Sequence, residues 1–192
     1  METKRETTSD IITIPNILSF IRLCLIPLIV WLYCGKEDYT WAGIFLIISG
    51  LTDIADGYLA RHFNWISDLG KILDPIAGKL TQAAMLICLV LRYPLMLLPF
   101  GLMVAKELFM TVSGLMVIKR TGVVASARWH GKVATCLLYA MMIFHVFWSD
   151  IPEVYSNLSI VLCALMIVVS FALYGADNLH ILHEHRKKRK QG

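Results

Sequence analysis

The sequence is short of charged side chains. Only 17% of its 192 residues are Asp, Glu, Lys or Arg, whereas 57% are hydrophobic and the mean hydropathy is +0.65. Soluble domains usually carry about 25% charged residues. The composition therefore excludes an ordinary soluble protein and indicates a membrane protein.

Paired cysteines and long linkers are also missing. Five cysteines stand singly within apolar runs, with no C-x-x-C pair among them. We interpret them as packing residues rather than as metal ligands or disulfide partners. No repeat, low-complexity segment or long linker divides the sequence. We expect one membrane domain over residues 1–192, with a cytoplasmic N-terminal segment at 1–11 and a basic cytoplasmic tail at 182–192.

Long apolar runs fill most of the sequence. A helix needs about 20 residues to cross the hydrocarbon core, where backbone groups cannot stay unpaired. The first run is longer than a signal-peptide core and has no clear small-residue cleavage site, so we interpret it as a retained helix. The sequence predicts an all-α integral membrane protein with six transmembrane helices, at roughly 12–34, 41–62, 73–92, 94–118, 129–149 and 155–181.

Lysine and arginine are distributed unevenly over the predicted connections. One side would carry the N-terminus, the second and fourth connections, the C-terminus and the adjoining helix ends. That side holds 16 of the 18 basic residues, and the other side holds only Lys36 and Arg92. Because the basic side is normally cytoplasmic, we predict that both termini face the cytoplasm. We interpret the basic tail as an anchor to anionic lipid and expect no nucleic-acid partner.

Two aspartates interrupt the second apolar run. Asp53 follows only 12 mostly apolar residues, and Asp56, Gly57 and Ala60 follow it at helical spacing on one stripe. Ionisable residues inside a membrane are costly and usually mark a site. Gly57 and Ala60 would let a large group approach the backbone closely. Surface capping of a helix end is the alternative interpretation of the two aspartates.

A third aspartate, Asp74, follows a loop that contains Gly70 and precedes Pro75. Since proline is tolerated near the first turn of a helix, we expect Asp74 to cap the third helix and to face the two aspartates of the second. Oxygen ligands from two helices suit Mg²⁺ or Mn²⁺, whose usual role is to hold phosphates. Arg61 could bind a phosphate or balance the charge.

The combined pattern resembles that of a known family. It reads D-x-x-D-G-x-x-A-R from Asp53 to Arg61, then eight residues, Gly70, three residues and Asp74. This is similar to the signature of the CDP-alcohol phosphatidyltransferases, and the six-span layout agrees over nearly the whole chain. The resemblance implies a membrane enzyme of phospholipid biosynthesis that moves a phosphatidyl or related group from a CDP-linked donor to an alcohol. It also implies one or two divalent ions and a homodimer.

The resemblance implies roles for individual residues. It implies that Mg²⁺ or Mn²⁺ is bound by Asp53, Asp56 and Asp74. It implies that the CDP-linked lipid is contacted by these aspartates and by Asn16, Ser19, Gly57, Ala60, Arg61, Ser67 and Gly70. For Asn16 and Ser19, which lie in the segment IPNILSFIRL, capping of a helix start is the alternative.

Three further segments, LDPIAGKL, VAKELF and HGKVAT, resemble those of bacterial phosphatidylglycerophosphate synthases, although Lys106 stands in place of an arginine and Ala134 in place of a lysine. The resemblance implies CDP-diacylglycerol and glycerol 3-phosphate as substrates, at the cytoplasmic side of a bacterial plasma membrane. A cardiolipin synthase that uses phosphatidylglycerol is the alternative. Acceptor-phosphate binding is predicted for Lys106, Arg120, Arg128 and Lys132, with anchoring of cytoplasmic helix ends as the alternative.

Position 78 departs from the family pattern. The family's last aspartate is assigned as the general base for the acceptor hydroxyl, and here the residue is Gly78. Removal of a general base typically costs about 10²–10⁴ in rate, so we predict an enzyme of impaired activity. A CDP-lipid-binding pseudoenzyme, or replacement of the base by another group such as His130, is the alternative. A transporter is disfavoured because the acids cluster at one end of the helices.

Overall fold

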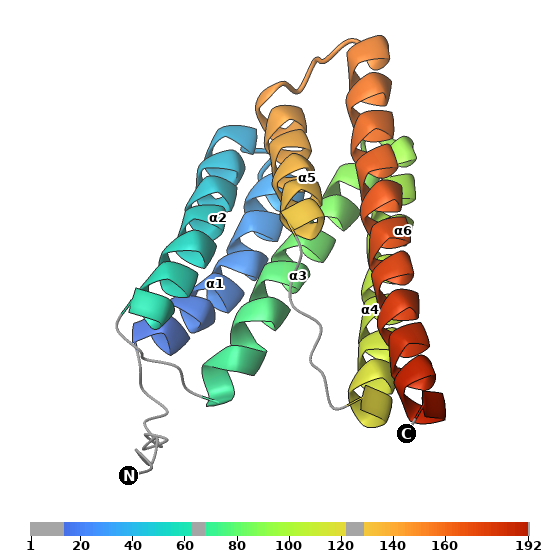
Figure 1. Ribbon diagram of the computed structural model, residues 1–192. Coiled ribbons are helices and arrows are strands. Elements are labelled where there is room, and N and C mark those ends of the chain that lie inside the picture. The colour runs from blue at the N-terminus through green and yellow to red at the C-terminus, as the bar shows by residue number, and fades with distance from the viewer. Residues whose placement is uncertain (1–13, 63–67, 122–128, 192) are drawn as a thin grey trace. The chain divides into compact units, whose positions relative to one another are not determined.

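The computed structural model describes residues 14–62, 68–121 and 129–191, which are helical apart from short turns. The elements are α1 (Ile14–Val30), the π-helical turn η1 (Trp31–Gly35), α2 (Tyr39–His62), α3 (Asp68–Val90), the 3₁₀ turn η2 (Pro94–Met96), α4 (Leu97–Thr121), α5 (Trp129–Phe147) and α6 (Glu153–Gln191) (Figure 1). These residues contain no strand, which confirms the all-α prediction.

Within the described residues, five segments are long and apolar enough to cross a membrane. They are Asn16–Gly35, Leu73–Val90, Pro94–Lys119, Trp129–Phe147 and Glu153–Leu179. In α2 the apolar stretch is shorter, at Tyr39–Ala55. The structure thus confirms a multi-pass helical membrane protein, and the count of six spans stays a prediction.

The start of α3 differs from the sequence prediction. We expected Asp74 to cap this helix, but α3 begins at Asp68, so Asp74 and Pro75 lie in its second turn. Proline in a helix interior removes one backbone hydrogen bond and clashes with the carbonyl four residues before it, but α3 includes Pro75 and the turns on both sides of it. The preceding residues Leu, Lys and Ile are compatible with a helix. Gly70 therefore lies in a helix rather than in a loop, and Asp74 lies one turn before Gly78.

The helices form two compact units. The first comprises Met1–Arg92 and Met142–Ser149, and the second comprises Tyr93–Met141 and Asp150–Gly192. In the first unit α1 packs along both α2 and α3. In the second unit α4 packs along α6. The prediction of a single membrane domain remains a prediction.

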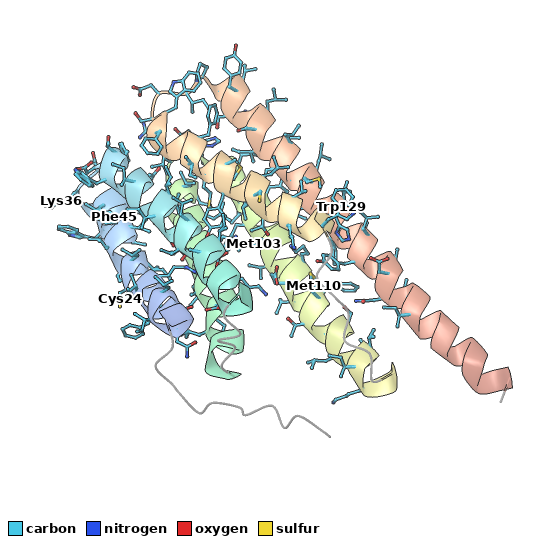
Figure 2. The ribbon with its side chains drawn as sticks, turned by 60° about the vertical axis from the view of Figure 1, so that its left-hand side comes forward. Cys24, Lys36, Phe45, Met103, Met110 and Trp129 are labelled. Atoms are coloured by element: carbon cyan, nitrogen blue, oxygen red, sulfur yellow. The ribbon has the colours of Figure 1, made fainter. Side chains whose placement is uncertain are left out.

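In the first unit, Arg92, which follows α3, contacts both the start of α2 and the segment that follows α5. The Nη2 of Arg92 donates a hydrogen bond of 2.7 Å to the carbonyl oxygen of Ser149, and its guanidinium lies 5.1 Å from the ring centroid of Tyr39. The Nζ of Lys36, labelled in Figure 2, lies 4.6 Å from the ring centroid of Trp31. Both basic residues that we assigned to the outer side thus belong to packed turns.

In the second unit, α4 and α6 meet through aromatic and polar side chains. The rings of Phe109 and Phe171 pack edge to face, with their centroids 4.9 Å apart. The Nδ2 of Asn178 donates a hydrogen bond of 2.8 Å to the Oγ of Ser113, and both residues are buried. Hydrogen bonds between helices stabilise packing inside a membrane. Large apolar side chains of α4 such as Leu108 stay exposed, which is compatible with contact to lipid.

Candidate active site

A stripe of polar side chains runs along α1. Asn16, Ser19 and Arg22 follow one another at intervals of three residues, which places them on one face of the helix. All three residues are buried, and Ser19 and Arg22 have no exposed surface. The segment is otherwise apolar, so this face is the part of α1 that can bind polar groups of its neighbours.

The α1 stripe contacts one aspartate on each neighbouring helix. The Oγ of Ser19 donates a hydrogen bond to the Oδ1 of Asp74 on α3. The Nη1 of Arg22 donates to the Oδ1 of Asp53 on α2, at 2.5 Å. Asp74 also interacts electrostatically with Asp53. The three helices of the first unit therefore bring two carboxylates together against donors from α1.

Position 78 faces this cluster. A Cβ atom built on Gly78 would lie 3.3 Å from the Oδ1 of Asp53 and 3.9 Å from its Cγ. The side chain of Asp53 is 42% exposed, so the space beside it opens toward the surface. A side chain at position 78 would consequently lie next to the Asp53 carboxylate, on the same helix as Asp74.

For several predicted site residues, the structure describes no side chain. Asp56, Gly57, Ala60 and Arg61 belong to α2, but the structure describes only their place in that helix. Ser67 lies outside the described residues. Gly70 is buried in the first turn of α3.

The start of α1 decides between the two interpretations of Asn16 and Ser19. Because α1 begins at Ile14, Asn16 and Ser19 lie inside the helix, and capping of its start is the wrong interpretation of both residues. Sequence reasoning also missed Arg22, which we counted only as a basic residue of the cytoplasmic side. Its signal was available, because a charge within an apolar run and three residues after Ser19 is a site hypothesis by itself.

The side chains present fit a hard divalent ion. Carboxylate oxygens are the ligands that Mg²⁺ and Mn²⁺ prefer, and Asp53 and Asp74 supply them from two helices that α1 holds together. Among the side chains that the structure describes, no group of three His, Cys, Asp or Glu forms a metal cluster. Asp56, the third expected ligand, is not among those side chains.

The predicted acceptor-phosphate cations belong to the second unit as far as they are described. Lys106 is buried in α4, and its Nζ lies 3.5 Å from the Oε1 of Glu107. Lys132 is exposed near the start of α5. Arg120 lies in α4 without a described side chain, and Arg128 lies outside the described residues.

The start of α5 is packed against α6. The Nδ1 of His130 lies 3.3 Å from the Oγ of Ser170, and its Nε2 lies 3.9 Å from the Oδ2 of Asp177. A Cβ atom on Gly131 would come within 2.6 Å of the Tyr174 hydroxyl, so only glycine fits there without a shift. These contacts fix the turn that carries Lys132.

The fold and the buried polar cluster together define a multi-pass membrane protein with a carboxylate site inside a helical unit. The chain belongs to the CDP-alcohol phosphatidyltransferase family, whose model matches residues 12–174. This match covers all the described residues of the cluster.

Curated relatives fall into two groups by name. A cardiolipin synthase (CMP-forming) of Streptomyces coelicolor is 38% identical over 143 residues, which are 71% of this chain and 66% of that protein. A cardiolipin synthase and mitochondrial hydrolase fusion protein of Schizosaccharomyces pombe is 38% identical over 108 residues, 56% of this chain and 18% of that protein. A CDP-diacylglycerol–glycerol-3-phosphate 3-phosphatidyltransferase of Aquifex aeolicus is 28% identical over 167 residues, 84% of this chain and 93% of that protein. The matches to the two cardiolipin synthases thus span less than two thirds of their lengths.

Proposed function

We propose that this chain transfers a phosphatidyl group from CDP-diacylglycerol to glycerol 3-phosphate and releases CMP. The observation that carries the proposal is the meeting of Asp53 and Asp74 beside position 78, in a chain that belongs to the CDP-alcohol phosphatidyltransferase family. The carboxylates supply the ligands that a phosphate-handling membrane site needs. The donor is a lipid, which suits a site inside helices that lie in a membrane.

The reaction moves one phosphorus between two oxygens. A hydroxyl of the acceptor attacks the phosphorus next to the diacylglycerol, and the bond from that phosphorus to the CMP oxygen breaks. A divalent ion bound by Asp53, Asp74 and, by the resemblance, Asp56 would neutralise negative charge on the leaving CMP. In the metal-free protein, Ser19 and Arg22 hold the two described carboxylates in place through the bonds from α1. The family resemblance assigns the CDP moiety to Gly57, Ala60, Arg61, Gly70 and the α1 residue Asn16.

The proton of the attacking hydroxyl has no acceptor at position 78. A carboxylate there would stand beside Asp53, but Gly78 has no side chain that could take the proton. We therefore propose that the chain binds its donor and turns over slowly. If the missing proton acceptor abolishes turnover altogether, the chain is a pseudoenzyme that only binds the CDP-lipid.

Phosphatidylglycerol is the second candidate acceptor, and a specific observation favours it. The cardiolipin synthase of S. coelicolor shares 38% of the aligned residues with this chain, against 28% for the phosphatidyltransferase of A. aeolicus. The match to the A. aeolicus protein is the more complete, at 93% of its length, and it supports glycerol 3-phosphate. Both acceptors present a hydroxyl of a phosphate-bearing glycerol, so the same attack would serve either one.

The setting of the reaction completes the proposal. The basic residues of the predicted cytoplasmic side include Arg22 and Arg61, which lie on the site-forming helices. We therefore propose a site at the cytoplasmic side of the membrane, with both termini in the cytoplasm. A bacterial plasma membrane and a homodimeric assembly are what the family resemblance implies.

An acceptor assay tests the proposed function. Full-length protein carrying Gly78→Asp is supplied with labelled CDP-diacylglycerol, Mg²⁺ or Mn²⁺, and either glycerol 3-phosphate or phosphatidylglycerol, and the lipid products are separated by chromatography. Labelled phosphatidylglycerophosphate supports the first proposal, and labelled cardiolipin supports the second. The protein with Asp53→Asn in addition is the matched control and should form neither product. If both acceptors stay unlabelled while the protein is folded, the proposed function is wrong.

A further inference from the structure

Arg22 is a fully buried arginine in the middle of an apolar helix. Its side chain has no exposed surface, and its Nη1 lies 2.5 Å from the Oδ1 of Asp53. Taking such a charge out of water is expensive unless it is paired with good geometry. Removing the carboxylate of Asp53 would leave this buried charge uncompensated by it and would destabilise the first unit.

The Asp53 oxygen that binds Arg22 also faces position 78. The Oδ1 of Asp53 accepts from Arg22, and it is also the atom nearest to the position of a Cβ on Gly78. A divalent ion bound by Asp53 and Asp74 would approach this same carboxylate group. The guanidinium of Arg22 thus already lies against a carboxylate that the proposed function assigns to the metal.

Charge makes the two cations competitors. A guanidinium that neutralises Asp53 lowers the negative potential available to a divalent ion, and at a few ångströms the repulsion between the two cations is substantial even in a partly hydrated site. Position 78 is a glycine and adds no carboxylate that would offset this repulsion.

We propose that Arg22 is an internal counter-cation that holds Asp53 in the metal-free protein and weakens divalent-ion binding until it is displaced. This inference rests on the proposed function, because it takes Asp53 as a metal ligand. When the metal takes the Asp53 oxygen, the released guanidinium can bind a phosphate oxygen of the donor, for which its planar fork is well suited. Arg22 is in this sense a positioning residue, which acts through Asp53.

Binding of Mn²⁺ alone tests the proposal without any turnover. The full chain in detergent is titrated with Mn²⁺, and free Mn²⁺ is measured by electron paramagnetic resonance. Arg22→Gln removes the charge and keeps a hydrogen-bond donor for Asp53, so the variant should bind Mn²⁺ about tenfold more tightly or better. Arg22→Lys keeps the charge and should bind as the unaltered chain does.

Two control variants distinguish the charge of Arg22 from other influences on the Mn²⁺ affinity. Lys79→Met removes the same charge from an exposed residue next to Gly78, where solvent screens it, so the Mn²⁺ affinity should change by less than about twofold. Ser19→Ala removes the donor to Asp74 without any change of charge and should not tighten Mn²⁺ binding. The thermal unfolding temperature of Arg22→Gln should fall without metal and rise on adding Mn²⁺ by more than that of the unaltered chain.

The outcomes distinguish this inference from the proposed function. Unchanged or weaker Mn²⁺ binding by Arg22→Gln, while the unaltered chain binds Mn²⁺, overturns the role of Arg22 and leaves the metal site standing. If neither form binds Mn²⁺ and Gly78→Asp does not bind it either, the metal site itself is wrong and the inference falls with it.

Discussion

Replacement of Gly78 by aspartate would place a carboxylate beside Asp53. The Cβ of the new residue would lie 3.3 Å from the Oδ1 of Asp53, which is close enough that the Asp53 side chain must move by a few tenths of an ångström. That movement is possible because the contact is with the end of a side chain that is 42% exposed. The backbone of α3 needs no change, since position 78 lies inside the helix.

A side chain at position 78 changes the stability of the protein in two opposing ways. Glycine in a helix interior costs about 1 kcal/mol relative to alanine, so Gly78→Ala should stabilise the protein by up to that amount. Two carboxylates about 4 Å apart repel by at most about 4 kcal/mol at an effective dielectric constant of 20, and exposure of Asp53 and the charge of Arg22 reduce this to about 1–2 kcal/mol. Gly78→Asp should therefore be less stable than Gly78→Ala without metal. A divalent ion at 100 times the dissociation constant of the aspartate variant would add about 2.7 kcal/mol to that variant. The order reverses when the alanine variant binds the ion too weakly to gain as much.

The rate should respond more strongly than the stability. A general base typically contributes about 10²–10⁴ in rate, so Gly78→Asp should raise the incorporation of labelled glycerol 3-phosphate into lipid by that factor. Gly78→Asn introduces a side chain of nearly the same volume as aspartate, but that side chain accepts no proton at neutral pH. Gly78→Ala removes only the cost of a glycine inside the helix. Both controls should stay at the rate of the unaltered chain. Equal rates for the aspartate, asparagine and alanine variants would refute the reasoning that position 78 holds the missing base.

Two further predictions concern packing and topology. Gly131→Ala should destabilise the protein by about 1–3 kcal/mol in thermal unfolding, because its Cβ would meet the hydroxyl of Tyr174 at 2.6 Å. A Cβ on Gly114 would meet no atom of the described residues within 4 Å, so Gly114→Ala should be neutral or stabilising. A loss of stability from Gly114→Ala equal to that from Gly131→Ala would contradict this packing. In a cysteine-free background, a cysteine at Lys36 should be labelled by an impermeant reagent from outside the cell and one at Lys190 only after the membrane is opened; the reverse pattern would contradict the predicted orientation.

The fold class and the family could be predicted from the sequence for physical reasons. A membrane forces long apolar runs into helices, so composition and run length were sufficient for an all-α membrane protein. The spacing from Asp53 to Asp74 was specific enough to indicate the family whose model matches residues 12–174. Helix bounds were less predictable, because Pro75 was given a first-turn position that α3 does not have.

The hydrogen-bond partners of the carboxylates could not be predicted from sequence spacing. Sequence spacing places Asp53 and Asp74 on their own helices, but the register between helices decides which groups of α1 meet them. Ser19 was nominated through the family resemblance alone, and its bond to Asp74 follows from the packing of α1 on α3. Arg22 was missed because the charge count treated it as a topology signal. The direction in which Gly78 faces also depends on this packing, and it turns out to be toward Asp53.

The most direct test of the central claim is the release of CMP from CDP-diacylglycerol by the Gly78→Asp protein. The claim is that Asp53 and Asp74 form a divalent-ion site that serves phosphatidyl transfer. We predict CMP release that requires both an acceptor and Mg²⁺ or Mn²⁺, and that falls by about 10² or more with Asp53→Asn or Asp74→Asn. CMP release that continues unchanged in a chelator, or in both asparagine variants, would contradict the account.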